Sequence, residues 1–327
     1  MQTTNILFFG STTDSVLVLE KLLHLSTVHS QFSISAIVTQ PPRPVGREKT
    51  ITPTPVEQWA KEHAITLLTF ESNPEKPWLY ADEQLVIDTL QPVAADIIIS
   101  ASYGIKIPTA TITAATFGGI NIHPSILPHW RGADPVPWAI LSGDHQIGVS
   151  ITTLTESFDE GKILAQEKTP ITSSDTSDPL RTKLFSIGAE LLIDILPRYI
   201  EGKLKTTSQL TDTHGKGVTI QYARKFKRED GFEAWETLFQ AMNEGTDAAR
   251  IERKYRALHP WPGIWTKIKT NENQMNNDND KAINEKRLKI LKLHLSNGKI
   301  VIDDVQLEGK KPVSWKQFDE AYFPPIA

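Results

Sequence analysis

The chain has 327 residues, enough for two domains of ordinary size, and 39% of them are hydrophobic and 23% charged, as in folded globular proteins. It has no cysteine, which excludes a disulfide scaffold, a zinc site built on thiolates and a cysteine nucleophile. No apolar run approaches the roughly 18 residues of a membrane helix, and the first residues lack the features of a signal peptide. We therefore expect a cytoplasmic protein without a membrane partner.

The net charge of −4 is divided unevenly along the chain. Residues 1–200 contain 13 Lys and Arg against 21 Asp and Glu, whereas residues 201–327 contain 22 against 18, so the two parts carry −8 and +4. A basic C-terminal part favours a polyanionic partner, although charged surfaces are more often simply solvated.

The first 200 residues alternate between strand and helix patterns. An apolar run at 5–9 ends at Gly10, and apolar residues at helical spacing follow, which is the opening of a βα unit. The expected later strands lie at 34–38, 66–68, 96–100, 119–123, 148–154 and 163–166, and the helices at 56–63, 83–90 and 180–200. Several strands are apolar on both faces, which predicts a Rossmann-like α/β domain whose mostly parallel sheet has helices on both faces.

A polar stretch without periodicity follows the last of these helices. We place a linker at 204–217, between a first domain at 1–203 and a second at 218–327. The second domain begins with a helical segment and continues with short strand-like runs, two of them joined by the hairpin signal Asn297-Gly298. This pattern predicts a small β-barrel domain with a leading helix.

The stretch with most chemistry surrounds the expected strand at 119–123. Asn121 and His123 are two residues apart, so both side chains project to one side at the carboxyl end of that strand, where ligands of parallel sheets bind. An amide donor beside an imidazole can hold a developing oxyanion. The ordinary alternative is an asparagine that caps a turn and a histidine bonded to the backbone. Asp159, 36 residues after His123, lies in an acidic turn and could orient the imidazole or merely form the turn.

Other site types find little support. There is no histidine and carboxylate cluster with metal-ligand spacing, no dinucleotide or phosphate-binding glycine motif and no G-x-S-x-G elbow. The loop 40–55 is longer than the about two to six residues usual between a strand and a helix. Its cations Arg43, Arg47 and Lys49 suit contact with phosphates, and a surface insertion is the alternative.

Together these segments resemble the folate-dependent formyltransferase family. The run N-I-H-P-S-I-L-P at 121–128, with Asp159 in a D-x-G turn, is similar to the family's signature. Three further segments resemble the members that act on methionyl-tRNA: T-Q-P-P-R-P-x-G-R-x-K at 39–49, W-R-G-A at 130–133 and H-P-W-P-G-I-W at 259–265.

The resemblance implies that the chain transfers the formyl group of 10-formyltetrahydrofolate to the α-amino group of methionyl initiator tRNA, for translation initiation. It implies a monomer that needs no metal, with Asn121, His123 and Asp159 as catalytic residues. The resemblance also implies that the smaller C-terminal domain is an OB-like β-barrel. Folate is expected to bind at Ser125, Ile126, Leu127, Pro128 and Tyr103, and tRNA at Arg43, Arg47 and Lys49.

One departure keeps alternatives open. Asp14 stands where the family has an aromatic residue near the methionyl side chain, and it could instead cap the first helix. Together with the acidic first part, it favours a sugar or nucleotide-sugar N-formyltransferase that uses the same donor. A non-catalytic RNA-binding protein on a formyltransferase core is a second alternative.

Overall fold

The computed structural model describes residues 3–28, 31–46, 48–209, 220–270 and 284–323. They form two compact units, which we describe separately. The first comprises Met1–Pro135, Gln146–Pro170 and Leu180–Arg224, and the second Val136–His145, Ile171–Pro179 and Lys225–Ala327. Residues 210–217 of the expected linker lie outside the described residues, so the domain limits at 203 and 218 stay a prediction.

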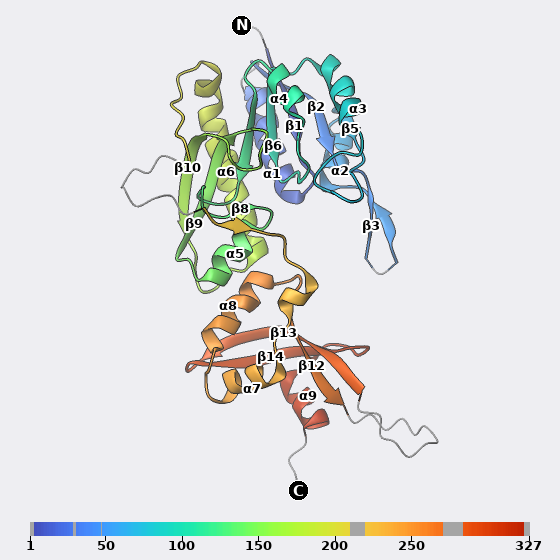
Figure 1. The fold of residues 1–327 in the computed structure, drawn as a ribbon, viewed down its shortest axis with the longest axis vertical. Coiled ribbons are helices and arrows are strands. Elements are labelled where there is room, and N and C mark those ends of the chain that lie inside the picture. Colours follow the sequence, from blue (N-terminus) through green and yellow to red (C-terminus); the bar gives the residue numbers. More distant parts are fainter. Residues whose placement is uncertain (1–2, 29–30, 47, 210–219, 271–283, 324–327) are drawn as a thin grey trace. The chain divides into compact units, whose positions relative to one another are not determined.

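A seven-stranded sheet runs through the first unit in the order β10-β9-β7-β6-β1-β2-β5 (Figure 1). Its strands are β1 (Thr4–Phe9), β2 (Phe32–Thr39), β5 (Leu67–Thr69), β6 (Ile97–Ala101), β7 (Gly119–His123), β9 (Gln146–Thr153) and β10 (Ile163–Pro170). The pairings among β1, β2, β5, β6 and β7 are parallel, whereas β9 is antiparallel to both β7 and β10. The predicted, mostly parallel sheet is therefore confirmed.

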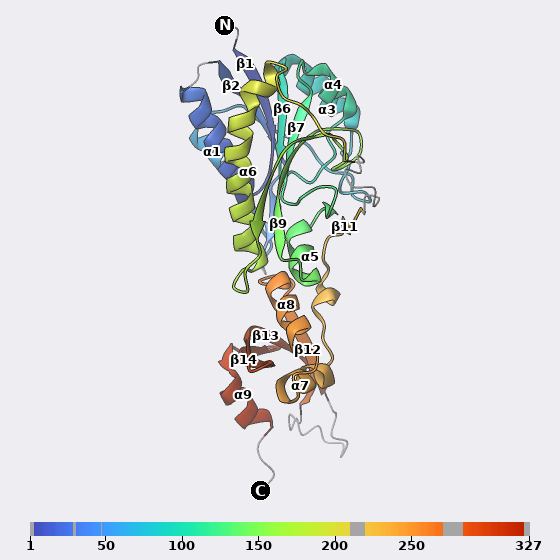
Figure 2. The ribbon, with the colours of Figure 1, turned by 90° about the vertical axis from the view of Figure 1, so that its left-hand side faces the viewer.

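Helices cover both faces of this sheet, as Figure 2 shows. On one face lie α1 (Thr13–Val28), α2 (Pro55–Glu62) and α6 (Ser177–Ile200), and on the other α3 (Glu83–Leu90) and α4 (Thr109–Ala114). Alternate residues of β1 enter different cores: Ile6 and Phe8 face the first group of helices, and Leu7 and Phe9 face the second. Burial on both faces explains why the last four residues of this strand, 6–9, are all apolar.

Asp14 is buried in the first turn of α1, with 1% of its surface exposed. Its carboxylate accepts hydrogen bonds from Arg181 Nε at 2.7 Å and from Thr182 Oγ1 at 3.2 Å, both on α6. Asp14 thus joins α1 to α6. Because its carboxylate is occupied within the protein, it does not indicate a polar substrate pocket.

The second unit contains an antiparallel sheet in the order β12-β13-β14-β15. The strands are β12 (Ile264–Thr270), β13 (Asn284–Ser296), β14 (Lys299–Leu307) and β15 (Val313–Ser314), and the helices packed on them are α7 (Trp235–Asn243), α8 (Ala248–Leu258) and α9 (Trp315–Tyr322). Asn297 and Gly298 form the predicted hairpin turn with φ of 50° and 77°. A C-terminal domain of antiparallel strands is confirmed.

Shorter elements complete the chain. They are β3 (Arg43–Val45), β4 (Thr50–Thr52), β8 (Arg131–Gly132), α5 (Pro135–Ser142), β11 (Tyr222–Ala223) and the 3₁₀ turns Gln91–Val93 and Arg228–Gly231. No helix in the described ranges is long and apolar enough to cross a membrane.

Close packing under β7 predicts a sensitive position on α6. A Cβ atom at Gly188 would lie 2.7 Å from Ile122 Cγ2 and 2.8 Å from Val149 Cγ2. Gly188→Val should therefore push α6 off β7 and lower the free energy of unfolding by about 1–3 kcal/mol in urea titrations. Ser186→Val, at an exposed position of the same helix, is the control and should cost less than about 1 kcal/mol. Equal losses in both variants would contradict this account.

Candidate active site

The carboxyl end of β7 carries a row of polar side chains on one face of the sheet. Asn121 and His123 share that face, because Ile120 and Ile122 point into the core beneath α6. In the β-ladders Asn121 pairs with Ser100 of β6 and Thr152 of β9. The predicted juxtaposition of Asn121 and His123 at a strand end is thus what the structure has.

His123 is buried and both of its ring nitrogens face oxygen atoms. Nδ1 lies 3.3 Å from Oδ1 of Asp159, and Nε2 lies 2.9 Å from the carbonyl oxygen of Trp130. Both ring nitrogens of His123 are therefore occupied by oxygen atoms of the protein, which fixes the orientation of the ring.

Asp159 is held by its side chain and by an unusual backbone conformation. Its Oδ2 accepts the N–H of Gly132 at 2.8 Å, while Oδ1 faces His123. Its φ of 56° is in the left-handed region, which aspartate tolerates better than most residues. The Asp159 side chain is 9% exposed, and these two contacts supply hydrogen-bonding partners for a carboxylate that is largely shielded from water.

Asn121 differs from its neighbours in having a free amide. It is half-buried, and its side chain has no hydrogen-bond partner among the described residues. The hydroxyl of Thr152, across the ladder from it, is buried and likewise lacks a partner within the described part of the chain. An unpaired donor next to a buried His–Asp pair is suited to bind a carbonyl oxygen.

The expected folate-binding segment follows β7 and is tied to β9. The Ser125 hydroxyl donates to the carbonyl of His129 at 2.6 Å, and the Leu127 N–H donates to Ser150 Oγ at 3.0 Å. Ser125 and Leu127 are buried, whereas Ile126 and Pro128 are half-buried. The polar groups of Ser125 and Leu127 serve the protein itself, which leaves the apolar side chains of the other two as the accessible part.

Tyr103 lies in the core rather than on a ligand-facing surface. Its ring is 3% exposed and packs edge-on against Phe9, and its hydroxyl pairs with that of Tyr80 at 2.8 Å. Its carbonyl accepts a hydrogen bond from Gln40 at the end of β2. The ring is thus not placed to stack on a ligand, and Tyr103 shapes the turn after β6.

Both parts of the chain match known protein families. The pattern of the formyl transferase family matches residues 4–196, and that of the formyl transferase C-terminal domain matches residues 245–322. The chain belongs to the formyl transferase family.

Several relatives within the family carry the name methionyl-tRNA formyltransferase. The chain is 35% identical to methionyl-tRNA formyltransferase from Listeria welshimeri over 266 residues, which cover 81% of this chain and 76% of the relative. It is 33% identical to methionyl-tRNA formyltransferase from Dictyoglomus thermophilum over 97% of this chain and 96% of the relative. A 4-N formyltransferase from Francisella tularensis has a similar fold, with a TM-score of 0.58 and 15% identity over 80% of this chain and 92% of that one. This last likeness concerns the fold alone.

The basic loop at 40–55 contains a β-hairpin in the structure. β3 and β4 pair between residues 43 and 52, where the sequence predicts only a long loop. Arg43 and Lys49 are exposed on it, and neither is paired with a carboxylate in the described part of the chain. Arg47 lies outside the described residues.

Sequence reasoning misses the backbone groups that hold the His–Asp pair. The carbonyl of Trp130 and the N–H of Gly132 flank Arg131 in the W-R-G-A run, which is the signal that could have found them. β8 pairs with β11, and a Cβ at Gly132 would lie 2.8 Å from the carbonyl oxygen of Ala223. Glycine is therefore required at this contact.

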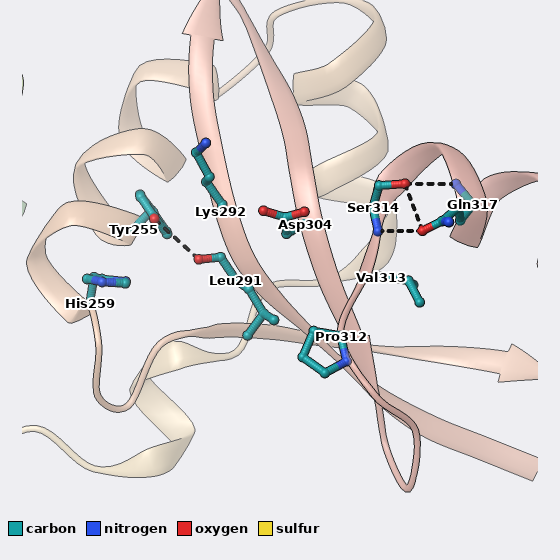
Figure 3. A pocket seen from close by; sticks show the side chains of 9 residues that line it. All are labelled: Tyr255, His259, Leu291, Lys292, Asp304, Pro312, Val313, Ser314 and Gln317. Carbon is teal, nitrogen blue, oxygen red and sulfur yellow. Dashed lines mark hydrogen bonds between the residues drawn. The ribbon is translucent and has the colours of Figure 1, made fainter.

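A hollow of about 640 Å³ lies elsewhere, in the second unit (Figure 3). Tyr255, His259, Lys292 and Asp304 are among its lining residues, and Tyr255 Oη donates to the Leu291 carbonyl there. None of the expected catalytic residues lines it. The described residues also contain no group of His, Cys, Asp and Glu that could hold a metal ion.

The tyrosine pair predicts how stability depends on pH. Burial raises the pKa of Tyr80 and Tyr103 above the ordinary value of about 10, so the folded protein keeps protons that the unfolded chain releases. Their contribution to stability is complete below about pH 10 and is lost as the pH rises further, by about 1.4 kcal/mol per pH unit for each tyrosine.

Urea unfolding at a series of pH values checks this dependence. Tyr103→Phe should make the alkaline loss of stability shallower, and it should cost about 1–3 kcal/mol at neutral pH because the Tyr80 hydroxyl loses its partner. Tyr222→Phe, which removes an exposed hydroxyl, is the control. An alkaline slope unchanged by Tyr103→Phe would contradict the assignment.

Proposed function

We propose that this chain transfers the formyl group of 10-formyltetrahydrofolate to the α-amino group of methionyl initiator tRNA. The observation that carries the proposal is the Asn121 amide, unbonded within the described residues, beside the His123–Asp159 pair at the end of β7. The relatives named methionyl-tRNA formyltransferase, at 33–35% identity, support the choice of acceptor.

The chemistry needs a neutral amine and a stabilised oxyanion. An α-amino group has a pKa near 8, so a useful fraction is neutral at physiological pH. The folate donor supplies a formyl carbon that the amine attacks, whereupon the carbonyl oxygen gains negative charge. Asn121 is the group with donors available for that oxygen, and one such donor typically contributes about 10²–10³ in rate.

His123 and Asp159 act beside it in different ways. Both nitrogens of His123 face protein oxygens, so its role is to hold the Asp159 carboxylate in position beside Asn121. Asp159 is the base that takes the proton from the attacking nitrogen, directly or through water, and returns it to the folate nitrogen as the carbon–nitrogen bond of the donor breaks. The proton and the formyl group thus change places between the two nitrogens.

The acceptor follows from the surroundings of this centre. Arg43 and Lys49 are exposed cations on a hairpin and suit tRNA phosphates. Asp14, which would favour a sugar acceptor if it faced substrate, is instead bonded to α6. Folate contacts are proposed at Ile126 and Pro128, with Ser125, Leu127 and Tyr103 shaping the surface.

The acceptor is tested directly with the purified chain and 10-formyltetrahydrofolate. Charged initiator methionyl-tRNA and a panel of nucleotide-linked amino sugars serve as acceptors in parallel, and formylated tRNA is detected by acid gel electrophoresis. Formylation of the tRNA alone supports the proposal, whereas formylation of an amino sugar without the tRNA overturns it.

Asn121 offers a test in which folding and catalysis separate. Asn121→Ala should lower kcat at least about a hundredfold, because the oxyanion loses its donor. The unfolding midpoint should stay near that of the wild type, since the Asn121 amide makes no hydrogen bond to the described protein. His123→Ala should lower kcat by a similar factor. Turnover like that of the wild type in either variant would remove these residues from the mechanism.

The hairpin cations predict a change in salt dependence. Arg43→Ala combined with Lys49→Ala should weaken tRNA binding and reduce the slope of log affinity against log salt by about two, roughly one for each phosphate contact. A charge-matched control replaces Lys168 and Lys183, two exposed lysines of the same unit, with alanine. Equal slopes for the two double variants in filter-binding titrations would exclude the hairpin from the tRNA site.

A further inference from the structure

Gln209 lies in the polar stretch after α6 and is nevertheless 5% exposed. Its Nε2 donates to the carbonyl oxygen of Asp159 at 2.8 Å and to that of Gly161 at 2.7 Å. Its Oε1 accepts hydrogen bonds from Arg131, from Nε at 3.1 Å and from Nη2 at 2.8 Å. Both ends of the Gln209 amide are thus hydrogen-bonded, and the donor end binds the turn that carries Asp159.

Arg131 anchors the acceptor end. It is 4% exposed, and its Nη1 also donates to Glu160 in the same turn at 2.9 Å. The next residue, Gly132, gives its N–H to the Asp159 carboxylate. The contacts therefore close a ring from Gln209 to the Asp159 backbone, through its carboxylate to Gly132, and through Arg131 back to Gln209.

The turn needs such support. The left-handed backbone of Asp159 is unfavourable for a residue with a side chain, and a buried carboxylate has to keep its partners. The turn also runs so close to β9 that a Cβ at Gly161 would lie 1.7 Å from the Thr153 carbonyl oxygen. Without the two amide hydrogen bonds, nothing else among the described side chains bonds to the Asp159 and Gly161 carbonyls.

We propose that Gln209 is a positioning residue that keeps the Asp159 carboxylate against His123. Its effect on turnover rests on the proposed function, whereas its effect on the turn does not. The alternative is that Gln209 merely stabilises the fold.

Gln209→Glu separates these roles. The carboxylate keeps the size of the side chain and an acceptor for Arg131, so the variant remains anchored. It replaces the donor end with an oxygen that faces two carbonyl oxygens, so the turn loses its hydrogen bonds from residue 209. Gln306→Glu is the matched control, because the Gln306 amide also donates to a backbone carbonyl, that of Lys310, in the second unit.

Kinetics give the first readout. Gln209→Glu should lower kcat at least about tenfold with little change in KM, as expected when a reacting group is misplaced. In an Asp159→Asn background the same substitution should have almost no further effect, because Gln209 acts through Asp159. Equal effects in both backgrounds, or an equal loss from Gln306→Glu, would overturn the proposal.

Amide hydrogen exchange gives a readout that needs no activity. The Gly132 N–H bonded to Asp159 should exchange at least about tenfold faster in Gln209→Glu, while amides in the core of β7 keep their protection. Unchanged Gly132 exchange overturns the positioning role even if the enzyme is active. If the wild-type protein formylates no tRNA but Gly132 still exchanges faster in Gln209→Glu, the proposed function is wrong and the positioning role is correct.

Discussion

The contacts of the Asp159 carboxylate hold the candidate active site together. One oxygen lies against His123, the last residue of β7, and the other accepts the N–H of Gly132 in β8. His123 is fixed at its second nitrogen by the carbonyl of Trp130, the residue before β8. A buried charge is tolerated only when it is paired and hydrogen-bonded, so these segments have to be in place together.

The change from parallel to antiparallel strands at one edge of the sheet brings these segments together. β9 runs antiparallel to β7, which places Ser150 opposite His123 and Thr152 opposite Asn121. The Ser150 hydroxyl then donates to the carbonyl of Ser125 and accepts the N–H of Leu127, so the loop after β7 is fastened to the same strand. Small hydroxyl side chains therefore flank His123 and Asn121 on β9, while large apolar residues fill the opposite face.

Sequence reasoning reached the parts of this arrangement that depend on local periodicity. The alternation of strands and helices predicted the sheet, and the two-residue period of a strand placed Asn121 and His123 together. The contact of His123 with Asp159 depends on how the β9–β10 hairpin returns, which spacing alone does not fix. Tyr103 follows a strand end as a ligand-facing residue would, and only the packing of the whole layer shows its ring buried. Gln209 has no periodic neighbours, and its partners in the turn lie 48 and 50 residues away.

The stretch after α6 contributes residues to the candidate active site. The first compact unit continues past that helix to Arg224, and in this extension Gln209 supports the Asp159 turn while β11 pairs with β8. A fragment that ends at residue 203 would contain every strand of the large sheet. It would lack Gln209, which bonds to the Asp159 turn, and β11, which pairs with β8. The contacts of the candidate active site therefore extend past α6, because buried polar groups of the Asp159 turn find their partner in Gln209 and β8 pairs with β11.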